Sequence, residues 1–337
     1  MKREIYDEDH EAFRASVKQF LDREVTPHLD TYAAGHGLDR DFWLAAGKQG
    51  FLGLEIPEEY GGSEAGDYRF NAVLTEELAK VNMTLPSCVG IHADITVPYL
   101  VHLTNDAQKA RWLPGAATGE ILTAIGMTEP GGGSDLANLK TTAVRDGDEW
   151  VINGSKTFIT NGGSADIVLV AARTSPEKKA EGISLFAVDT TLEGFSVGRV
   201  LDKVGQDESD TAELSFEDVR VSGDDLVGPL DTGFISMMQF LPQERLGSAI
   251  TNLAHARQIL DETVQYAKDR HAFGQPIGSF QNTQFLLADL VTRVEVTQAY
   301  VDQCVVAHTK QELTPVDAAK AKWWTSQVQN DVLDHCV

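Results

Sequence analysis

Glu244 is the residue whose type and surroundings best suit acid–base chemistry, and it lies in the segment 241–246, Leu-Pro-Gln-Glu-Arg-Leu. Pro242 has no amide N–H and clashes with the carbonyl four residues earlier, so we expect it to start or kink a helix. Two apolar and two small residues are the helical neighbours of the glutamate: Phe240, Leu241, Gly247 and Ser248. A cavity there would disfavour the charged carboxylate, raise its pKa and make it a stronger base. The alternative is a surface glutamate that pairs with an arginine.

A second candidate is the glycine-rich segment 125–135, Ile-Gly-Met-Thr-Glu-Pro-Gly-Gly-Gly-Ser-Asp. Its three consecutive glycines would let the backbone approach a flat or anionic ligand closely. The segment lacks the lysine of a P-loop, and no G-x-G-x-x-G opens a helix, so neither nucleotide fingerprint is present. The alternative is an ordinary glycine-rich turn.

The segment 156–162, Lys-Thr-Phe-Ile-Thr-Asn-Gly, is a candidate edge of a cofactor site. In a strand, Phe158 and Thr160 would share one side because side chains alternate with a period of two. An aromatic ring beside a hydroxyl donor suits one edge of a planar cofactor. The alternative is a strand with one core aromatic before a turn.

A predicted loop between two helices, 269–278, contains the fourth candidate, followed by Phe280 and Gln281. Arg270 offers a bidentate fork for phosphate, and Phe273 could pack on a ring system. The alternative is a cation in the last turn of a helix, which is stabilising without being functional.

The sequence contains no motif that predicts a metal site or a nucleophilic serine. The histidines His92, His102 and His255 do not form a metal-ligand spacing, and neither HExxH nor Gly-x-Ser-x-Gly occurs. The three cysteines are odd in number and include no CxxC pair, which argues against a disulfide scaffold and favours a reducing compartment. We therefore predict no metal site.

The charge balance excludes a further class of partner. The chain has 337 residues, with 28 Lys and Arg against 51 Asp and Glu, so its net charge is −23. Such a surface repels phosphate backbones, and we expect no nucleic-acid partner. No apolar run reaches the roughly 18 residues of a membrane span, and the acidic start resembles neither a signal nor a transit peptide. We expect a cytoplasmic protein.

Changes in hydrophobic period divide the chain into three predicted domains. We expect helices over 1–120, with breaks at Gly/Pro positions such as Pro114-Gly115. Short apolar runs and turns over 121–230 predict strands, including a hairpin at Asn153-Gly154 and a turn at Asn161-Gly162. No long helical pattern separates these strands, so a β-barrel or sandwich fits better than a parallel sheet.

The helical period returns over 231–337, giving an α+β multidomain protein. Two predicted apolar faces are Leu246, Ile250, Leu253 and Leu260, then Phe285, Leu286, Leu290 and Val294. The last helix is amphipathic and has no C-cap glycine or following proline. We expect the bundle to be truncated relative to a complete domain, or its open face to be covered by a partner subunit.

Taken in order, these segments resemble the acyl-CoA dehydrogenase family, most closely its long-chain type. The resemblance rests on 127–135, 158–161, 241–246, the Arg270-x-x-Phe-Gly segment with Gln281, and the helix around Lys322-Trp-Trp. It implies a helical domain, a β-barrel and a helical bundle, assembled as a homotetramer (or homodimer), with FAD between barrel and bundle.

The resemblance also implies roles for individual residues. Those expected to contact FAD are Ile125, Met127, Thr128, Gly133, Ser134, Phe158, Ile159, Thr160 and, toward a neighbouring subunit, Arg270, Phe273 and Gln281. Phe158 would stack on the flavin and Thr160 would bond near its N5. Those expected to contact the acyl-CoA substrate are Ser134, Ile235, Pro242, Gln243, Glu244 and Arg245. Glu244 would be the catalytic base, at the helix position used by long-chain and isovaleryl types.

The implied reaction is α,β-dehydrogenation of an acyl-CoA to a trans-2-enoyl-CoA in fatty-acid β-oxidation, with electrons passed to an electron-transfer flavoprotein. The site must polarise the thioester and exclude water, because a free glutamate is far too weak a base for the α-proton. The preferred length of the acyl chain would depend on the depth of the cavity near Ile235 and Phe240. The alternatives are an acyl-CoA oxidase-like flavoenzyme, a branched-chain (isovaleryl-type) dehydrogenase and a non-catalytic, truncated relative.

Overall fold

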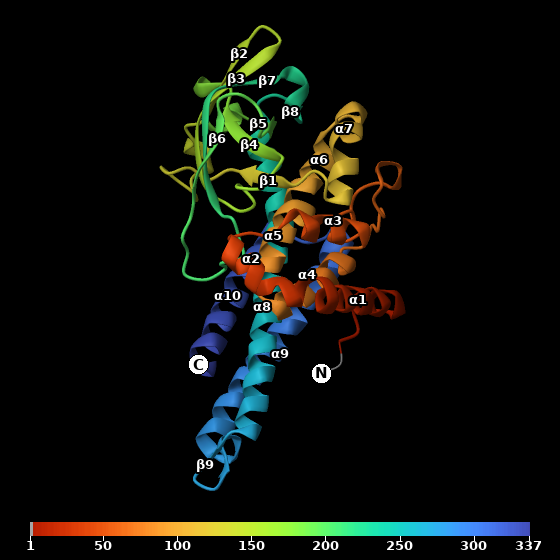
Figure 1. The fold of residues 1–337 in the computed structure, drawn as a ribbon, viewed down its shortest axis with the longest axis vertical. Coiled ribbons are helices and arrows are strands. Elements are labelled where there is room, and N and C mark those ends of the chain that lie inside the picture. Colours follow the sequence, from red (N-terminus) through yellow and green to blue (C-terminus); the bar gives the residue numbers. More distant parts are fainter. Residues whose placement is uncertain (1–2) are drawn as a thin grey trace. The chain divides into compact units, whose positions relative to one another are not determined.

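The structure is a computed structural model that describes residues 3–337. Its α-helices are α1 (Glu8–Phe20), α2 (Leu29–Gly35), α3 (Arg40–Lys48), α4 (Arg69–Val81), α5 (Thr84–Gly90), α6 (Val97–Leu103), α7 (Asp106–Thr118), α8 (Gly233–Asp269), α9 (Gln281–Thr309) and α10 (Pro315–Cys336). Its strands are β1 (Thr123–Gly126), β2 (Thr142–Asp146), β3 (Glu149–Ile159), β4 (Ile167–Arg173), β5 (Ile183–Asp189), β6 (Phe195–Val200), β7 (Ala212–Ser222), β8 (Leu226–Val227), β9 (His271–Ala272) and β10 (Gln275–Pro276). Helices precede and follow a central run of strands, which confirms the predicted α+β order (Figure 1).

The described chain forms two compact units. The helical unit comprises residues 3–21, 67–86 and 242–337, and the sheet unit comprises 22–66 and 87–241. Helix α8 begins in the sheet unit and continues into the helical unit. The N-terminal helices are thus shared between the units, because α1 and α4 belong to the helical unit whereas α2, α3, α6 and α7 belong to the sheet unit.

The sheet unit is built on one eight-stranded sheet. Hydrogen-bonded neighbours follow the order β6-β7-β3-β2-β4-β5-β8, and β1 lies beside β4. Most neighbours are antiparallel, while β1 with β4 and one residue pair of β2 with β4 are parallel. The expectation against a βαβ sheet is confirmed, and closure of the sheet into a barrel stays a prediction.

Strand β4 is buried on both of its faces, which explains its continuous apolar run. Leu169 and Ala171 point to a core shared with Val97 of α6 and Trp112 of α7. The alternate residues Val168, Val170 and Ala172 point to a second core with β3, β5 and β7. The sheet unit therefore packs helices on one side of β4 and strands on the other.

The helical unit packs α8, α9 and α10 around one apolar core. The predicted stripe on α8 is confirmed, since Leu246, Ile250, Leu253 and Leu260 are all buried. On α9, Leu290 and Val294 are buried, but Phe285 is 66% exposed, so its predicted place in the stripe is wrong. Phe285 precedes Leu290 by five residues, which turns it about 140° away from the buried stripe.

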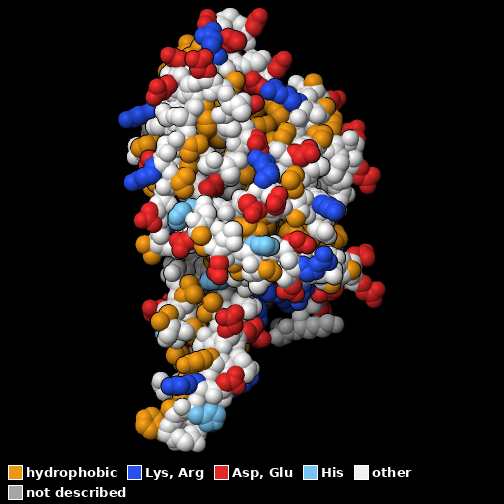
Figure 2. Space-filling view, in the orientation of Figure 1, with side chains coloured by type: hydrophobic (Ala, Val, Ile, Leu, Met, Phe, Trp, Pro, Cys, Tyr) orange, Lys and Arg blue, Asp and Glu red, His pale blue; other side chains and the backbone are white. Residues whose placement is uncertain are grey.

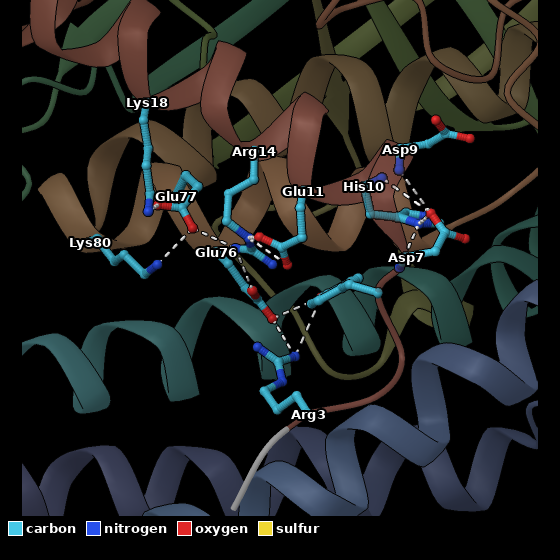
Figure 3. Close-up of polar contacts among 11 residues, drawn as sticks. Arg3, Asp7, Asp9, His10, Glu11, Arg14, Lys18, Glu76, Glu77 and Lys80 are labelled. Carbon is cyan, nitrogen blue, oxygen red and sulfur yellow. Dashed lines mark hydrogen bonds and ion pairs between the residues drawn. The ribbon is translucent and has the colours of Figure 1, made fainter.

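Within the helical unit, buried charges join the N-terminal segment to α4 (Figure 3) and also to α9. Arg3 pairs with Glu76 and with Asp302, at 2.6 Å each, and Arg14 bonds Glu76 at 3.0 Å and also Glu77. Burial alone would raise the pKa of Glu76, but the two guanidinium groups outweigh it and hold that pKa below its usual value. A cavity of about 240 Å³ adjoins this cluster.

Two local predictions are wrong, each because packing outweighs a local preference. Asn153-Gly154 lies inside β3 at a bulge with β7, where a side chain on Gly154 would collide with Thr141. Pro114 lies within α7, whose neighbouring residues Trp112 and Leu113 are anchored in the core. Pro242 lies within α8, so it does not start that helix, and the alternative that it kinks the helix stays a prediction.

Candidate active site

In the sheet unit, the structure brings the glycine-rich segment beside the end of β3. Strand β1 ends at Gly126, the second residue of that segment. The amide of Thr157 donates to the carbonyl of Thr128 at 3.0 Å. Reciprocal backbone hydrogen bonds of 3.0 Å between Glu129 and Gly132 then close the turn. The segments 125–135 and 156–162, which were separate candidates in the sequence, therefore form one surface.

Lys156 and Glu129 form a buried ion pair beneath this surface, which sequence reasoning missed. The Lys156 Nζ lies 2.8 Å from Glu129 Oε1, and the lysine side chain has no solvent exposure. Burial lowers the pKa of Lys156 to about 8, although the glutamate opposes the shift. Burial would raise the pKa of Glu129, but hydrogen bonds from Lys156 and from the Lys140 amide bring it below its usual value. The sequence did contain one indication of this pair, because a lysine two positions before Phe158 in a buried strand needs a partner for its charge.

Phe158 and Thr160 do not share one side of a regular strand, so that prediction is wrong. The pairing of β3 with β7 shifts register between Lys156 and Ile159, and Phe158 has a left-handed φ of 59°. The bulge exposes 66% of Phe158 while Ile159 points into the core. Thr160 follows the end of the strand and is half-buried.

The predicted turn at Asn161-Gly162 is confirmed. The carbonyl of Asn161 accepts from the Ala165 amide at 2.8 Å, and its side-chain amide donates to the Cys88 carbonyl at 2.9 Å. Asn161 is buried and holds the chain as it leaves Thr160. The end of β3 is therefore anchored on both sides of the exposed phenylalanine.

The residues of this surface fit a flavin cofactor. A Cβ built on Gly131 or Gly132 would meet nothing within 4 Å, so their backbone is uncovered. The exposed Phe158 ring offers a face for stacking. Thr128 and Ser134 add hydroxyl groups that can donate or accept, as an isoalloxazine edge requires. The surface thus combines an aromatic face, polar groups and approachable backbone.

In the helical unit, Glu244 lies on α8 and is half-buried, as are Gln243 and Arg245. The Gln243 side-chain oxygen lies 3.0 Å from Nε2 of His308 on α9, whose ring packs edge-on against Tyr68 at 4.4 Å. Position 244 is therefore set by a rigid helix whose adjacent residue is hydrogen-bonded to the next helix. Ile235, on the sheet-unit part of α8, is 59% exposed.

Arg270, Phe273 and Gln281 lie at the opposite end of α8, around the β9–β10 hairpin (Figure 1). All three are exposed, and Phe273 reaches 94%. Twenty-six residues separate Arg270 from Glu244, which corresponds to about 39 Å along a helix. Within one chain these residues do not meet Glu244, so any shared cofactor site would require a second copy.

Comparison with proteins of known family identifies the family of this chain. Sequence models of the N-terminal, middle and C-terminal acyl-CoA dehydrogenase domains match residues 7–120, 124–219 and 231–337. The chain belongs to the acyl-CoA dehydrogenase family. It is 42% identical to the mitochondrial long-chain specific acyl-CoA dehydrogenase of Sus scrofa, over 99% of this chain and 78% of that protein. It is 33% identical to the mitochondrial isovaleryl-CoA dehydrogenase of Pongo abelii, over 96% of this chain and 78% of that protein.

Solved structures agree with this assignment. An acyl-CoA dehydrogenase from Geobacillus kaustophilus superposes with a TM-score of 0.96 at 41% identity, covering 98% of this chain and 87% of that one. A glutaryl-CoA dehydrogenase from Mycobacterium smegmatis, solved in complex with FADH2, superposes with a TM-score of 0.91 at 26% identity, covering 98% of this chain and 84% of that one. As a member of this family, the protein is a flavin-dependent oxidoreductase that acts on CH–CH bonds.

The described residues contain no helix long and apolar enough to cross a membrane. Among the same residues, no group of three or more His, Cys, Asp or Glu side chains could hold a metal ion. On the face that Figure 2 shows, acidic side chains are interspersed with lysines and arginines.

Proposed function

We propose that this protein is an FAD-dependent acyl-CoA dehydrogenase that converts a long-chain acyl-CoA to the trans-2-enoyl-CoA and passes electrons to an electron-transfer flavoprotein. The observation that carries the proposal is the half-buried Glu244 on the rigid helix α8, in a chain 42% identical to a long-chain specific relative. The three family models that match residues 7–120, 124–219 and 231–337 support the proposed division into domains 1–120, 121–230 and 231–337.

Glu244 removes the α-proton of the thioester in this proposal. A carboxylate next to an apolar helix face loses hydration when substrate covers it, which strengthens it as a base. Gln243 holds this helix turn through its hydrogen bond with His308. Arg245 supports the geometry of the site in this proposal, as the resemblance to the family implies. The resemblance to the family adds Ser134, Ile235 and Pro242 to the residues proposed to contact the acyl-CoA.

The flavin-binding residues are those of the β1 loop and the end of β3. Phe158 supplies a stacking face, Thr160 and Thr128 supply hydroxyls, and the glycine run supplies backbone amides. FAD, when bound, supplies the acceptor for the β-hydride. Arg270, Phe273 and Gln281 would serve a neighbouring copy in a homotetramer, which light scattering of the holoprotein would test.

The proposal is tested on the visible spectrum of purified protein, followed by anaerobic titration with palmitoyl-CoA. We expect a flavin band that bleaches as substrate is added. A band that stays unbleached by palmitoyl-CoA but bleaches with isovaleryl-CoA would replace the long-chain assignment with a branched-chain one, which the 33% identical relative supports. Stoichiometric peroxide formed in air would indicate an oxidase. No band after added FAD would refute the cofactor assignment.

A further inference from the structure

The buried pair of Lys156 and Glu129 lies outside every role assigned above. Lys156 Nζ donates to the Met127 carbonyl at 3.2 Å and to Glu129 Oε1 at 2.8 Å. The glutamate accepts two further bonds, from the amides of Lys140 at 2.5 Å and Thr141 at 2.9 Å. Each carboxylate oxygen is therefore occupied, and the ammonium has two acceptors.

Together these bonds hold three consecutive residues of the glycine-rich segment. The Met127 carbonyl is held by Lys156, the Thr128 carbonyl by the Thr157 amide, and the Glu129 side chain by Lys156 and the 140–141 backbone. Lys156 lies two residues before Phe158 on the same strand, β3. One side chain thus connects the two segments that carry the candidate flavin contacts.

The fold also makes room for this lysine. A Cβ on Gly126 would lie 3.3 Å from Lys156 Cγ, tighter than an ordinary contact, so glycine at the end of β1 leaves space for the aliphatic stem. A buried ion pair of this kind contributes little net stability, because desolvation offsets the attraction and apolar pairs of similar volume often replace it without loss. Stability alone is therefore a weak reason for placing a fully buried lysine here.

We propose that Lys156, anchored by Glu129, is a positioning residue that fixes the backbone of 127–129 relative to Phe158, so that both segments present one flavin-binding surface. This inference rests on the proposed function. Lys156 acts through the Met127 carbonyl and the Glu129 carboxylate, and it does not itself touch the cofactor.

The test compares FAD affinity and the flavin absorption spectrum in matched variants. K156M alone leaves a buried carboxylate without its cation and could unfold, so the main variant is E129Q/K156M, which removes both charges at similar volume. The glutamine oxygen keeps an acceptor for one of the two amides, of Lys140 and Thr141, that bond separate oxygens of Glu129. The control is K178M, because Lys178 also pairs with a carboxylate, Asp231, at 2.7 Å but is half-exposed. Circular dichroism and thermal melting report folding in each variant.

We expect E129Q/K156M to fold, to bind FAD roughly tenfold or more weakly than the wild type, and to show a shifted flavin band. K178M should match the wild type in both readouts. If the double variant folds and keeps the wild-type affinity and spectrum, the inference is wrong. If it does not fold, the same readouts on E129Q decide, and unchanged affinity and spectrum there overturn the inference. A wild-type protein that takes up no FAD refutes the proposed function and this inference with it.

Discussion

Replacing Arg14 with methionine removes the central cation of the buried cluster in Figure 3. Its side chain is 11% exposed and faces Glu76 and Glu77, which are 8% and 2% exposed. Removing one partner of a buried pair costs about 3–5 kcal/mol, because a charge is left without compensation. Here Glu76 keeps Arg3 at 2.6 Å, and Glu77 keeps Lys80 at 2.6 Å. We therefore expect the lower end of the range, about 3 kcal/mol.

Arg220 provides the matched control. It also pairs with two carboxylates, Asp146 at 2.6 Å and Glu149 at 2.9 Å, but its side chain is 51% exposed. An exposed pair of this kind contributes little to stability, because solvent screens the charges. Urea unfolding followed by circular dichroism should show a free energy of unfolding lowered by about 3 kcal/mol in R14M and by much less in R220M. If R14M loses no more than R220M, the cluster does not clamp the N-terminal segment and the reasoning fails.

Three further predictions concern catalysis, pH and the cofactor. E244Q should keep FAD, but palmitoyl-CoA should reduce its flavin roughly 10²–10⁴-fold more slowly than in the wild type. The control E262Q, on the same helix, should be reduced at the wild-type rate. Anaerobic stopped flow measures both rates. Burial lowers the pKa of His92 from 6.5 to about 4, so the unfolded chain binds a proton that the folded chain does not. Stability should fall as the pH falls from about 6.5 to 4, by up to about 3 kcal/mol, and H92Q should lack that part of the loss in urea titrations at pH 7 and 5. F158A should bind FAD roughly three- to tenfold more weakly without a change in melting temperature, while V144A, equally exposed on β2, should change neither.

The order of elements could be predicted from the sequence because hydrophobic period is a local property. The α8 stripe with Leu246 and Leu253 was predicted and is found. Position 244 could be placed on a helix for the same reason. The glycine-rich segment could be singled out because an unbroken glycine run is visible in the sequence itself.

How these pieces meet depends on the packing of distant parts of the chain. The Lys156–Glu129 pair joins residues 27 positions apart, and it exists because β3 returns past the loop that follows β1. The exposure of Phe158 depends on a bulge against β7, a strand that begins more than fifty residues later. The contact of Arg14 with Glu76 spans 62 positions. Periodicity identifies which face of an element is apolar, but it carries no information about which distant charge or strand lies opposite, because that choice is made by the packing of the whole fold.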